Sequence, residues 1–238
     1  MVPWLTRKLA FPHPDTADKD GVVAVGGDLS VERLLLAYRS GIFPWPVEDV
    51  PLLWFSPDPR WVVVPAESHL PRSLRKEIRR NTYEVRVDTD FAGVINRCAE
   101  TSRPGQESTW ITFELEAAYN ALHRDGYAHS IEAWQDGALV GGLYGVSIGR
   151  AFFGESMFAH APDASKVAFA ALLGNLIAWG FDFVDCQTKT AHLQRFGAVP
   201  WSRKRFLKAV AETQQHPTRR GRWTFDLTPA EAEKRIEG

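Results

Sequence analysis

Apolar residues recur at helical spacing in several segments of the chain. Between residues 31 and 38 they fall at i, i+3, i+4 and i+7, with Ser30 in front as a candidate N-cap and Gly41 behind as a stop. Asp90 precedes a second such run, and Gly126 follows a third. The spacing predicts helices over residues 31–40, 71–81, 91–98, 113–124, 165–180 and 202–212.

Residues 128–158 instead alternate between apolar and polar side chains, which is typical of half-buried strands. Asp136-Gly137 is a typical hairpin turn between the first two of them. The segment 181–187, "FDFVDCQ", is short and nearly apolar, as in a central strand. The order of helices and strands predicts an α/β (α+β) fold in which helices cover a mixed sheet.

Proline and glycine are dense in the first sixty residues, so the pattern predicts a small irregular N-terminal domain over 1–60. The remaining residues, 61–238, form the larger predicted domain. The segment from Pro217 onward is polar, and we expect it to be loosely held.

Composition narrows the classes of function. The 28 basic and 29 acidic residues nearly cancel, so a nucleic-acid site has to be a local patch. The two cysteines are far apart and fit a reducing cytoplasm, and the seven histidines are scattered without metal-ligand spacing. We therefore expect no metal and no cofactor. No apolar run reaches the roughly 18 residues of a membrane span, and nothing indicates an obligate dimer, so we expect a monomer.

The most unusual polar group is Asp185-Cys186-Gln187 at the end of the predicted central strand. Alternate residues of a strand point to opposite faces, so Asp185 and Gln187 share one face and Cys186 points to the core. This parity argues against a cysteine nucleophile, since buried free cysteines are usually inert. Glu155 is also unusual, because large apolar residues flank it and a buried carboxylate requires a partner.

A row of cations is the other candidate site. The spacing 0, 3, 4, 7, 8 places five of them on one face of the predicted helix 71–81, with almost no acid on that helix to balance them. Phosphate contacts would account for such a row. The five residues are Arg72, Arg75, Lys76, Arg79 and Arg80.

The motifs "GGDLS", "GIFPW", "WFSPDPR", "TWIT", "LVGGLYGV", "GESMF" and "DCQ" occur in this order. With them the chain resembles the leucyl/phenylalanyl-tRNA–protein transferases. The resemblance implies an acetyltransferase-like catalytic domain. It also implies transfer of Leu or Phe, with Met as a further candidate, from aminoacyl-tRNA to proteins with N-terminal Arg or Lys, which marks them for N-end-rule degradation.

The resemblance also implies roles for particular residues. Asp185 and Gln187 correspond to the catalytic pair, and Glu155 to the residue that binds the acceptor's cationic side chain. The remaining positions belong to two binding sites. Trp45 and Trp110 match tryptophans near the terminal adenosine, and Leu143, Leu172 and Leu176 match the pocket for the donor side chain.

These residue types suit aminolysis of an ester. An α-amine has a pKa of about 7.7–8.0, so roughly a tenth is neutral near pH 7 and no strong base is needed. Asp185 can hold the amine and accept its proton, and Gln187 offers both a donor and an acceptor to orient it. The tRNA 2′-hydroxyl is an alternative proton carrier.

Two other functions remain open. An acyl-CoA N-acetyltransferase would need a Gly-rich pyrophosphate loop before the helix 165–180, and the chain has none there. A tRNA-binding protein without catalysis would use the row of cations and Trp45, but not Glu155, Asp185 and Gln187 together.

Overall fold

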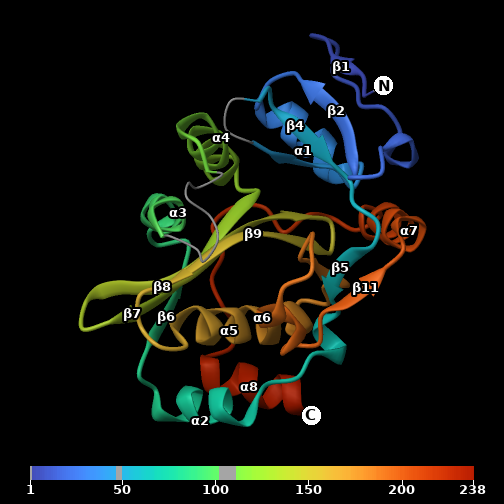
Figure 1. Cartoon of the computed structure of the whole chain (residues 1–238). Helices are drawn as coiled ribbons and strands as arrows, with labels where there is room; N and C mark the ends of the chain where they lie inside the picture. Colours follow the sequence, from blue (N-terminus) through green and yellow to red (C-terminus); the bar gives the residue numbers. More distant parts are fainter. Residues whose placement is uncertain (1, 47–49, 102–110) are drawn as a thin grey trace.

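The computed structural model describes residues 2–46, 50–101 and 111–238, and it contains two sheets (Figure 1). The first is a four-stranded N-terminal sheet in the order β1-β2-β4-β3, with helix α1 beside it. Residues 1–60 are thus more regular than the density of proline and glycine suggested. The elements are β1 (Trp4–Leu5), η1 (Pro14–Thr16), β2 (Val22–Gly26), α1 (Val31–Arg39), β3 (Phe43–Trp45) and β4 (Leu53–Phe55).

The second sheet has seven strands in the order β11-β5-β10-β9-β8-β7-β6. Every neighbouring pair is antiparallel except β10 and β9, which run parallel. The α/β class predicted from the sequence is confirmed, whereas the acetyltransferase-like form and the division at residue 60 stay predictions. The strands are β5 (Arg60–Val63), β6 (Glu84–Val87), β7 (Ala128–Gln135), β8 (Ala138–Ile148), β9 (Ala151–Ala159), β10 (Phe183–Asp185) and β11 (Val199–Trp201).

Helices cover both faces of this sheet (Figure 1). Helices α3 and α4 lie on the face nearer the N-terminal sheet, and α5 crosses the other face with α2 and α8 beyond it. Strand alternation sorts the core accordingly, because Tyr144 and Phe153 join one cluster, whereas Leu143 and Phe152 join the other. The helices are η2 (Pro65–Glu67), α2 (Arg72–Arg80), α3 (Phe91–Glu100), α4 (Phe113–Arg124), α5 (Ala164–Ala178), α6 (Ala191–Gln194), α7 (Arg203–Thr213) and α8 (Pro229–Glu237).

The capping residues recognised in the sequence act as predicted. The side chains of Ser30 and Asp90 accept hydrogen bonds from backbone N–H groups in the first turns of α1 and α3. Gly41 follows α1 with a φ of +71°, a conformation that glycine adopts without strain. These local signals place the helix boundaries within a few residues of the predicted ones.

The parallel pair β9 and β10 separates after three residues. Phe183, Val184 and Asp185 pair with the start of β9, and the last of them lies opposite Phe153. Beyond this point β9 continues to Ala159, whereas the segment after β10 turns away from it at Gln187, whose φ is +54°. The separation opens a gap in the sheet next to Glu155.

The C-terminal segment is not loosely held, so that expectation was wrong. Trp223 is buried, and its backbone N–H donates to the Asp88 carboxylate at 2.7 Å. The Asn175 side chain accepts the backbone N–H groups of Asp226 and Leu227, which leads the chain into α8. Helix α8 then packs against α5, driven by apolar contacts that the polar character of the segment conceals.

The packing of α8 on α5 predicts an unusual effect of Gly174→Ala. A Cβ added at Gly174 would clash with the Cα and Cβ of Ala232, so the two helices would have to move apart. Alanine normally stabilises a helix by about 1 kcal/mol relative to glycine, whereas overpacking costs about 1–3 kcal/mol. We expect a net loss in the free energy of unfolding in urea. A gain, the usual effect in a helix, would contradict the observed docking of α8.

Candidate active site

A cavity of about 320 Å³ lies where β9 and β10 separate, and the N-terminal strand β3 forms its opposite wall. Its floor and sides come from the middle of β8 and β9, from α5 and α6, and from the chain after β10. Much of the wall is apolar, and three polar side chains lie together in it: Glu155, Asp185 and Gln187. The larger apolar residues are Phe43, Trp45, Leu143, Met157, Phe169 and Leu193.

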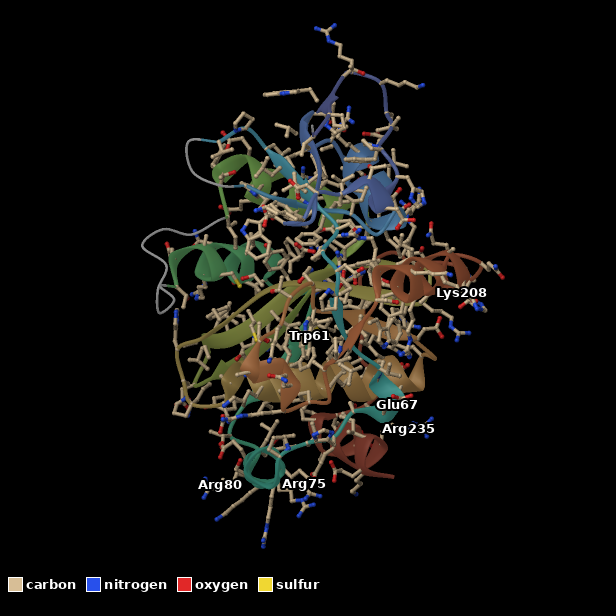
Figure 2. All side chains as sticks on the ribbon, turned by 45° about the vertical axis from the view of Figure 1, so that its right-hand side comes forward. Trp61, Glu67, Arg75, Arg80, Lys208 and Arg235 are labelled. Carbon is tan, nitrogen blue, oxygen red and sulfur yellow. The ribbon has the colours of Figure 1, made fainter. Side chains whose placement is uncertain are left out.

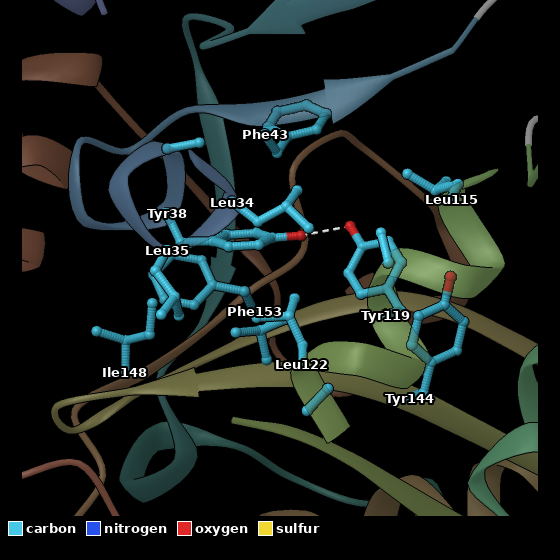
Figure 3. Packing of buried hydrophobic residues seen from close by; sticks show 14 of the residues in the cluster. Leu34, Leu35, Tyr38, Phe43, Leu115, Tyr119, Leu122, Tyr144, Ile148 and Phe153 are labelled. Atoms are coloured by element: carbon cyan, nitrogen blue, oxygen red, sulfur yellow. Dashed lines mark hydrogen bonds between the residues drawn. The ribbon is translucent and has the colours of Figure 1, made fainter. Parts of the chain in front are cut away.

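Two tyrosines hold the Glu155 carboxylate. The Tyr38 hydroxyl donates to Oε1 and the Tyr119 hydroxyl to Oε2, each at 2.8 Å, and the two hydroxyls lie 2.5 Å apart. Figure 3 shows them pointing toward each other from α1 and α4. Burial, opposed by these hydrogen bonds, raises the pKa of Glu155 to about 7. The carboxyl group therefore changes charge near neutral pH.

Asp185 is fully buried in an ion pair with Arg60, which is fully buried as well. The guanidinium donates from Nε to Oδ1 at 2.8 Å and from Nη2 to Oδ2 at 2.6 Å, which is the bidentate geometry of a strong pair. Oδ1 also accepts the backbone N–H of Gln187 at 2.9 Å. Asp185 thus fixes the backbone of the residue that enters the cavity.

Gln187 adopts a left-handed backbone conformation, which its hydrogen bond to Asp185 helps to hold. Its side-chain amide donates to the Gly154 carbonyl at 2.6 Å and lies 3.5 Å from Glu155 Oε1. The amide and the two carboxylates therefore form one connected group. These are the three residues to which the family resemblance assigned catalysis and acceptor binding, and their roles stay predictions.

Cys186 belongs to the core cluster around α5, as expected, but it also borders the cavity instead of facing away from it. The parity argument does not extend to Gln187, because β10 ends at Asp185 and Gln187 is left-handed. The Cys186 thiol donates weakly to the Val184 carbonyl at 3.7 Å. Burial, together with the charge of Asp185, raises the pKa of Cys186 well above its usual range. The thiolate that a nucleophile requires is not formed near neutral pH.

Sequence comparison places this site in a known family. The profile described as "Leucyl/phenylalanyl-tRNA protein transferase" matches residues 62–211, and the profile of that family's N-terminal domain matches residues 27–58. The chain belongs to the leucyl/phenylalanyl-tRNA protein transferase family. The family resemblance inferred from the short motifs is thereby confirmed.

Curated relatives with the name leucyl/phenylalanyl-tRNA–protein transferase align along most of their length. The protein from Myxococcus xanthus is 60% identical over 90% of this chain and 92% of its own. The protein from Anaeromyxobacter dehalogenans is 57% identical over 93% and 95%, and that from Nitratidesulfovibrio vulgaris 54% over 92% and 94%. The family assignment thus covers both sheets of the structure.

The other residues matched to the family are placed unevenly. Trp45 and Leu143 line the cavity, whereas Leu172 and Leu176 are fully buried and lie outside its lining. Phe169, one turn before Leu172 on α5, reaches the cavity instead, so the expectation for these two leucines differs from what the structure shows. Trp110 lies outside the described residues.

More of the cations on α2 have acidic partners than the sequence of that helix suggested. Arg75 pairs with Glu237 at 2.6 Å and Arg79 with Glu233 at 2.7 Å, both acids belonging to α8. Arg80 pairs with Glu77 within α2. Two cations, Arg72 and Lys76, are exposed and have no acid within ion-pair distance in the described ranges 2–46, 50–101 and 111–238.

Figure 2 shows that α2 lies at the end of the molecule remote from the N-terminal sheet, with Arg75 and Arg80 directed outward. The two ion pairs to α8 are not simple surface pairs, because Arg75 and Glu237 are half-buried and the partner of the exposed Arg79, Glu233, is buried. These two arginines therefore help to hold α8 against α2. The row remains a candidate phosphate-binding surface, now centred on Arg72 and Lys76.

Three residues of the site did not emerge from sequence patterns: Tyr38, Tyr119 and Arg60. The two tyrosines occupy apolar positions of helical patterns, so they were assigned to the core, where they also lie. Arg60 carried a usable signal, because it begins an otherwise apolar strand, "RWVV". A buried arginine in such a strand requires an acid partner, but only the fold identifies Asp185 as that partner.

The environment of Cys186 predicts low thiol reactivity. The native protein should react with iodoacetamide at pH 7.5 far more slowly than the protein in denaturant, because both cysteines are buried. Mass spectrometry of the alkylated peptides measures each cysteine separately. Rapid alkylation of Cys186 in the native state would restore it as a candidate nucleophile.

Proposed function

We propose that this protein transfers leucine or phenylalanine from aminoacyl-tRNA to the N-terminal Arg or Lys of acceptor proteins, which marks them for degradation. Methionine is a further candidate donor. The observation that carries the proposal is the cluster of Glu155, Gln187 and Asp185 in an apolar cavity of a chain from this family. Such a cavity suits a cationic acceptor together with an apolar donor side chain.

Aminolysis needs an aligned neutral amine more than a strong base. A protein α-amine has a pKa of about 7.7–8.0, so part of it is already neutral at physiological pH. Alignment of an amine with an ester contributes on the order of 7–11 kcal/mol in favourable cases. The chain's own residues therefore need chiefly to hold two substrates in place.

We assign orientation of the amine to Gln187, whose side chain lies between Gly154 and Glu155. Asp185 already accepts two hydrogen bonds from Arg60 and one from Gln187. Because these hydrogen bonds already occupy its carboxylate, we propose that Asp185 acts mainly by holding Gln187. A direct role for Asp185 in accepting the proton, or for the tRNA 2′-hydroxyl in carrying it, stays a secondary proposal.

Glu155 provides the negative charge for the acceptor's guanidinium or ammonium group. For the donor side chain we propose the apolar wall that contains Leu143 and Phe169, with Leu172 and Leu176 supporting α5 from within the core. Trp45 is our candidate stacking surface for the terminal adenosine, together with Trp110. The tRNA body would contact α2.

We further propose that the protein acts as a cytoplasmic monomer without a metal or cofactor. No helix among the described residues is long and apolar enough to cross a membrane. In those same ranges no group of three or more histidine, cysteine or acidic residues is placed to hold a metal.

The deciding experiment mixes the protein with Phe-tRNA or Leu-tRNA and a peptide that begins with Arg, and follows the peptide mass. Addition of one Phe or Leu residue supports the proposed function. Binding of tRNA without transfer would favour a non-catalytic tRNA-binding protein. Binding of acetyl-CoA in calorimetry, with acetylation of the peptide, would favour the acyl-CoA alternative.

The raised pKa of Glu155 predicts how acceptor recognition depends on pH. Below about pH 7 the Glu155 carboxyl is neutral and loses its attraction for a cation. We measure kcat/KM for an Arg-initiated peptide and divide it by kcat/KM for a citrulline-initiated peptide. This ratio should fall as the pH drops from 8 to 6, by up to roughly tenfold per pH unit below the pKa of Glu155. Both peptides share the titration of the α-amine, so it cancels in the ratio.

Glu155→Gln provides the control for this pH effect. In this variant the ratio of kcat/KM for the Arg-initiated peptide to that for the citrulline-initiated peptide should be low. It should not change with pH, because the amide carries no charge at any pH in the range. A ratio that stays constant from pH 8 to 6 in the unmodified protein would contradict the assignment of Glu155 to the acceptor's cationic side chain.

The free cations of α2 predict a change in salt dependence. Each phosphate contact contributes about 0.7–0.9 to the slope of log K against log salt. The double variant Arg72→Ala/Lys76→Ala should thus flatten the slope by about one to two units for every tRNA. Transfer from an aminoacyl-adenosine donor should be unchanged, because that donor does not reach α2. An unchanged slope would remove α2 from the tRNA surface.

A further inference from the structure

Arg60 is paired with Asp185 beside the cavity, but unlike Asp185 and Glu155 it does not line the cavity. It is fully buried at the first position of β5, behind Asp185. Its side chain reaches from the seven-stranded sheet toward the segment that links α1 to β3 in the N-terminal sheet. Arg60 therefore touches no substrate in the cavity, but it contacts the structures on both sides of it.

Two aromatic rings lie against the Arg60 guanidinium. The centroids of Phe43 and Phe206 each lie 4.5 Å from its central carbon. Phe43 belongs to β3 and is part of the cavity wall, whereas Phe206 belongs to α7. Desolvated cation–π contacts of this kind favour a single position of the arginine.

The edge of the same guanidinium binds two more segments. Nε and Nη2 hold the two oxygens of Asp185, and Nη1 lies 3.5 Å from the Gly41 carbonyl. Gly41 lies two residues before Phe43, and Asp185 holds the backbone N–H of Gln187. One planar group thus contacts the N-terminal wall and the segment that presents Gln187.

Only arginine fits this position. Its planar fork matches both carboxylate oxygens while its faces remain free to stack on rings. A lysine would keep the positive charge but would lose the second hydrogen bond and the stacked plane. The Asp185 carboxylate, and with it the backbone of Gln187, would then be held by a single mobile contact.

We propose that Arg60 is a positioning residue for the transfer reaction, which holds Gln187 and the Phe43–Trp45 wall at the separation that the two substrates require. This inference rests on the proposed function. Arg60 acts through Asp185 and Phe43 rather than on the substrates. Its loss should therefore lower kcat more than it weakens the binding of tRNA.

The test compares Arg60→Lys with Arg33→Lys. Arg33 is a matched control, because it is also a buried arginine paired with an aspartate, but it lies in α1 and contacts Asp28 and the Thr6 carbonyl instead of the cavity. We expect Arg60→Lys to lower kcat by about 100-fold, the effect of a displacement near 1 Å. Arg33→Lys should lower the Tm by a similar amount with kcat unchanged.

A second measurement separates positioning from stability. In Arg60→Ala, millimolar guanidinium chloride should restore part of kcat, because the free ion can occupy the slot between the two rings and Asp185. Sodium and ammonium chloride at the same concentration should not. Restoration of the Tm without any restoration of kcat would show a purely structural role and would overturn the proposal.

Phe206→Leu decides the matter if the Arg60 variants do not fold. It keeps the ion pair and removes one of the two rings, so the protein should fold and show a reduced kcat with unchanged tRNA affinity. If a folded Arg60→Lys or Phe206→Leu protein had the same kcat as the unsubstituted protein, the proposal would be overturned. Absence of transfer in the unsubstituted protein would instead overturn the proposed function, so the two failures are distinguishable.

Discussion

The site depends on the separation of two neighbouring parallel strands. Strands β9 and β10 share only three paired positions, and the chain after Asp185 then leaves the sheet. The backbone groups that no longer pair with β9 are bound in other ways. The Gln187 N–H donates to the Asp185 carboxylate, and the Gly154 carbonyl accepts from the Gln187 side chain. The sheet is thereby opened without leaving these polar groups unsatisfied.

Two carboxylates, Asp185 and Glu155, lie where the sheet opens, and a small network of hydrogen bonds and one ion pair stabilises them. Asp185 is neutralised by Arg60, and Glu155 is held by two tyrosine hydroxyls rather than by a cation. The two carboxylates therefore differ in character. Asp185 forms a bidentate ion pair with Arg60, whereas burial raises the pKa of Glu155 to about 7.

The N-terminal sheet completes this arrangement. The sheet contributes Phe43 and Trp45 to the cavity wall, and helix α1 beside it contributes Tyr38 to the hydrogen bonds at Glu155. Neither sheet alone contains the whole site. The aromatic contacts between Tyr38 and Phe153, at 5.1 Å, and between Phe43 and Arg60 bind the two parts closely. These contacts across the junction suit a reaction that depends on alignment.

Long-range packing explains why two expectations from the sequence were wrong, one about the C-terminal segment and one about the charge balance of α2. The C-terminal segment looks polar, yet Trp223 is buried against His129 and Trp179, and Ala232 is buried against Gly174 of α5. The acids that balance α2 lie more than 150 residues away in the chain, as the pairing of Arg79 with Glu233 illustrates. Neither fact is visible in a local pattern, since both depend on how α8 is docked.

Local physics determined the parts that the sequence alone could establish. Side-chain periodicity and capping defined the helices, and the ordered motifs identified the family. The tertiary structure decided which groups meet. The divergence of β9 and β10 created the cavity, the packing of α1 and α4 brought Tyr38 and Tyr119 to Glu155, and the position of α5 placed Phe169 rather than Leu172 in the cavity wall. Those contacts join residues far apart in the chain, and no local spacing encodes the distance between them.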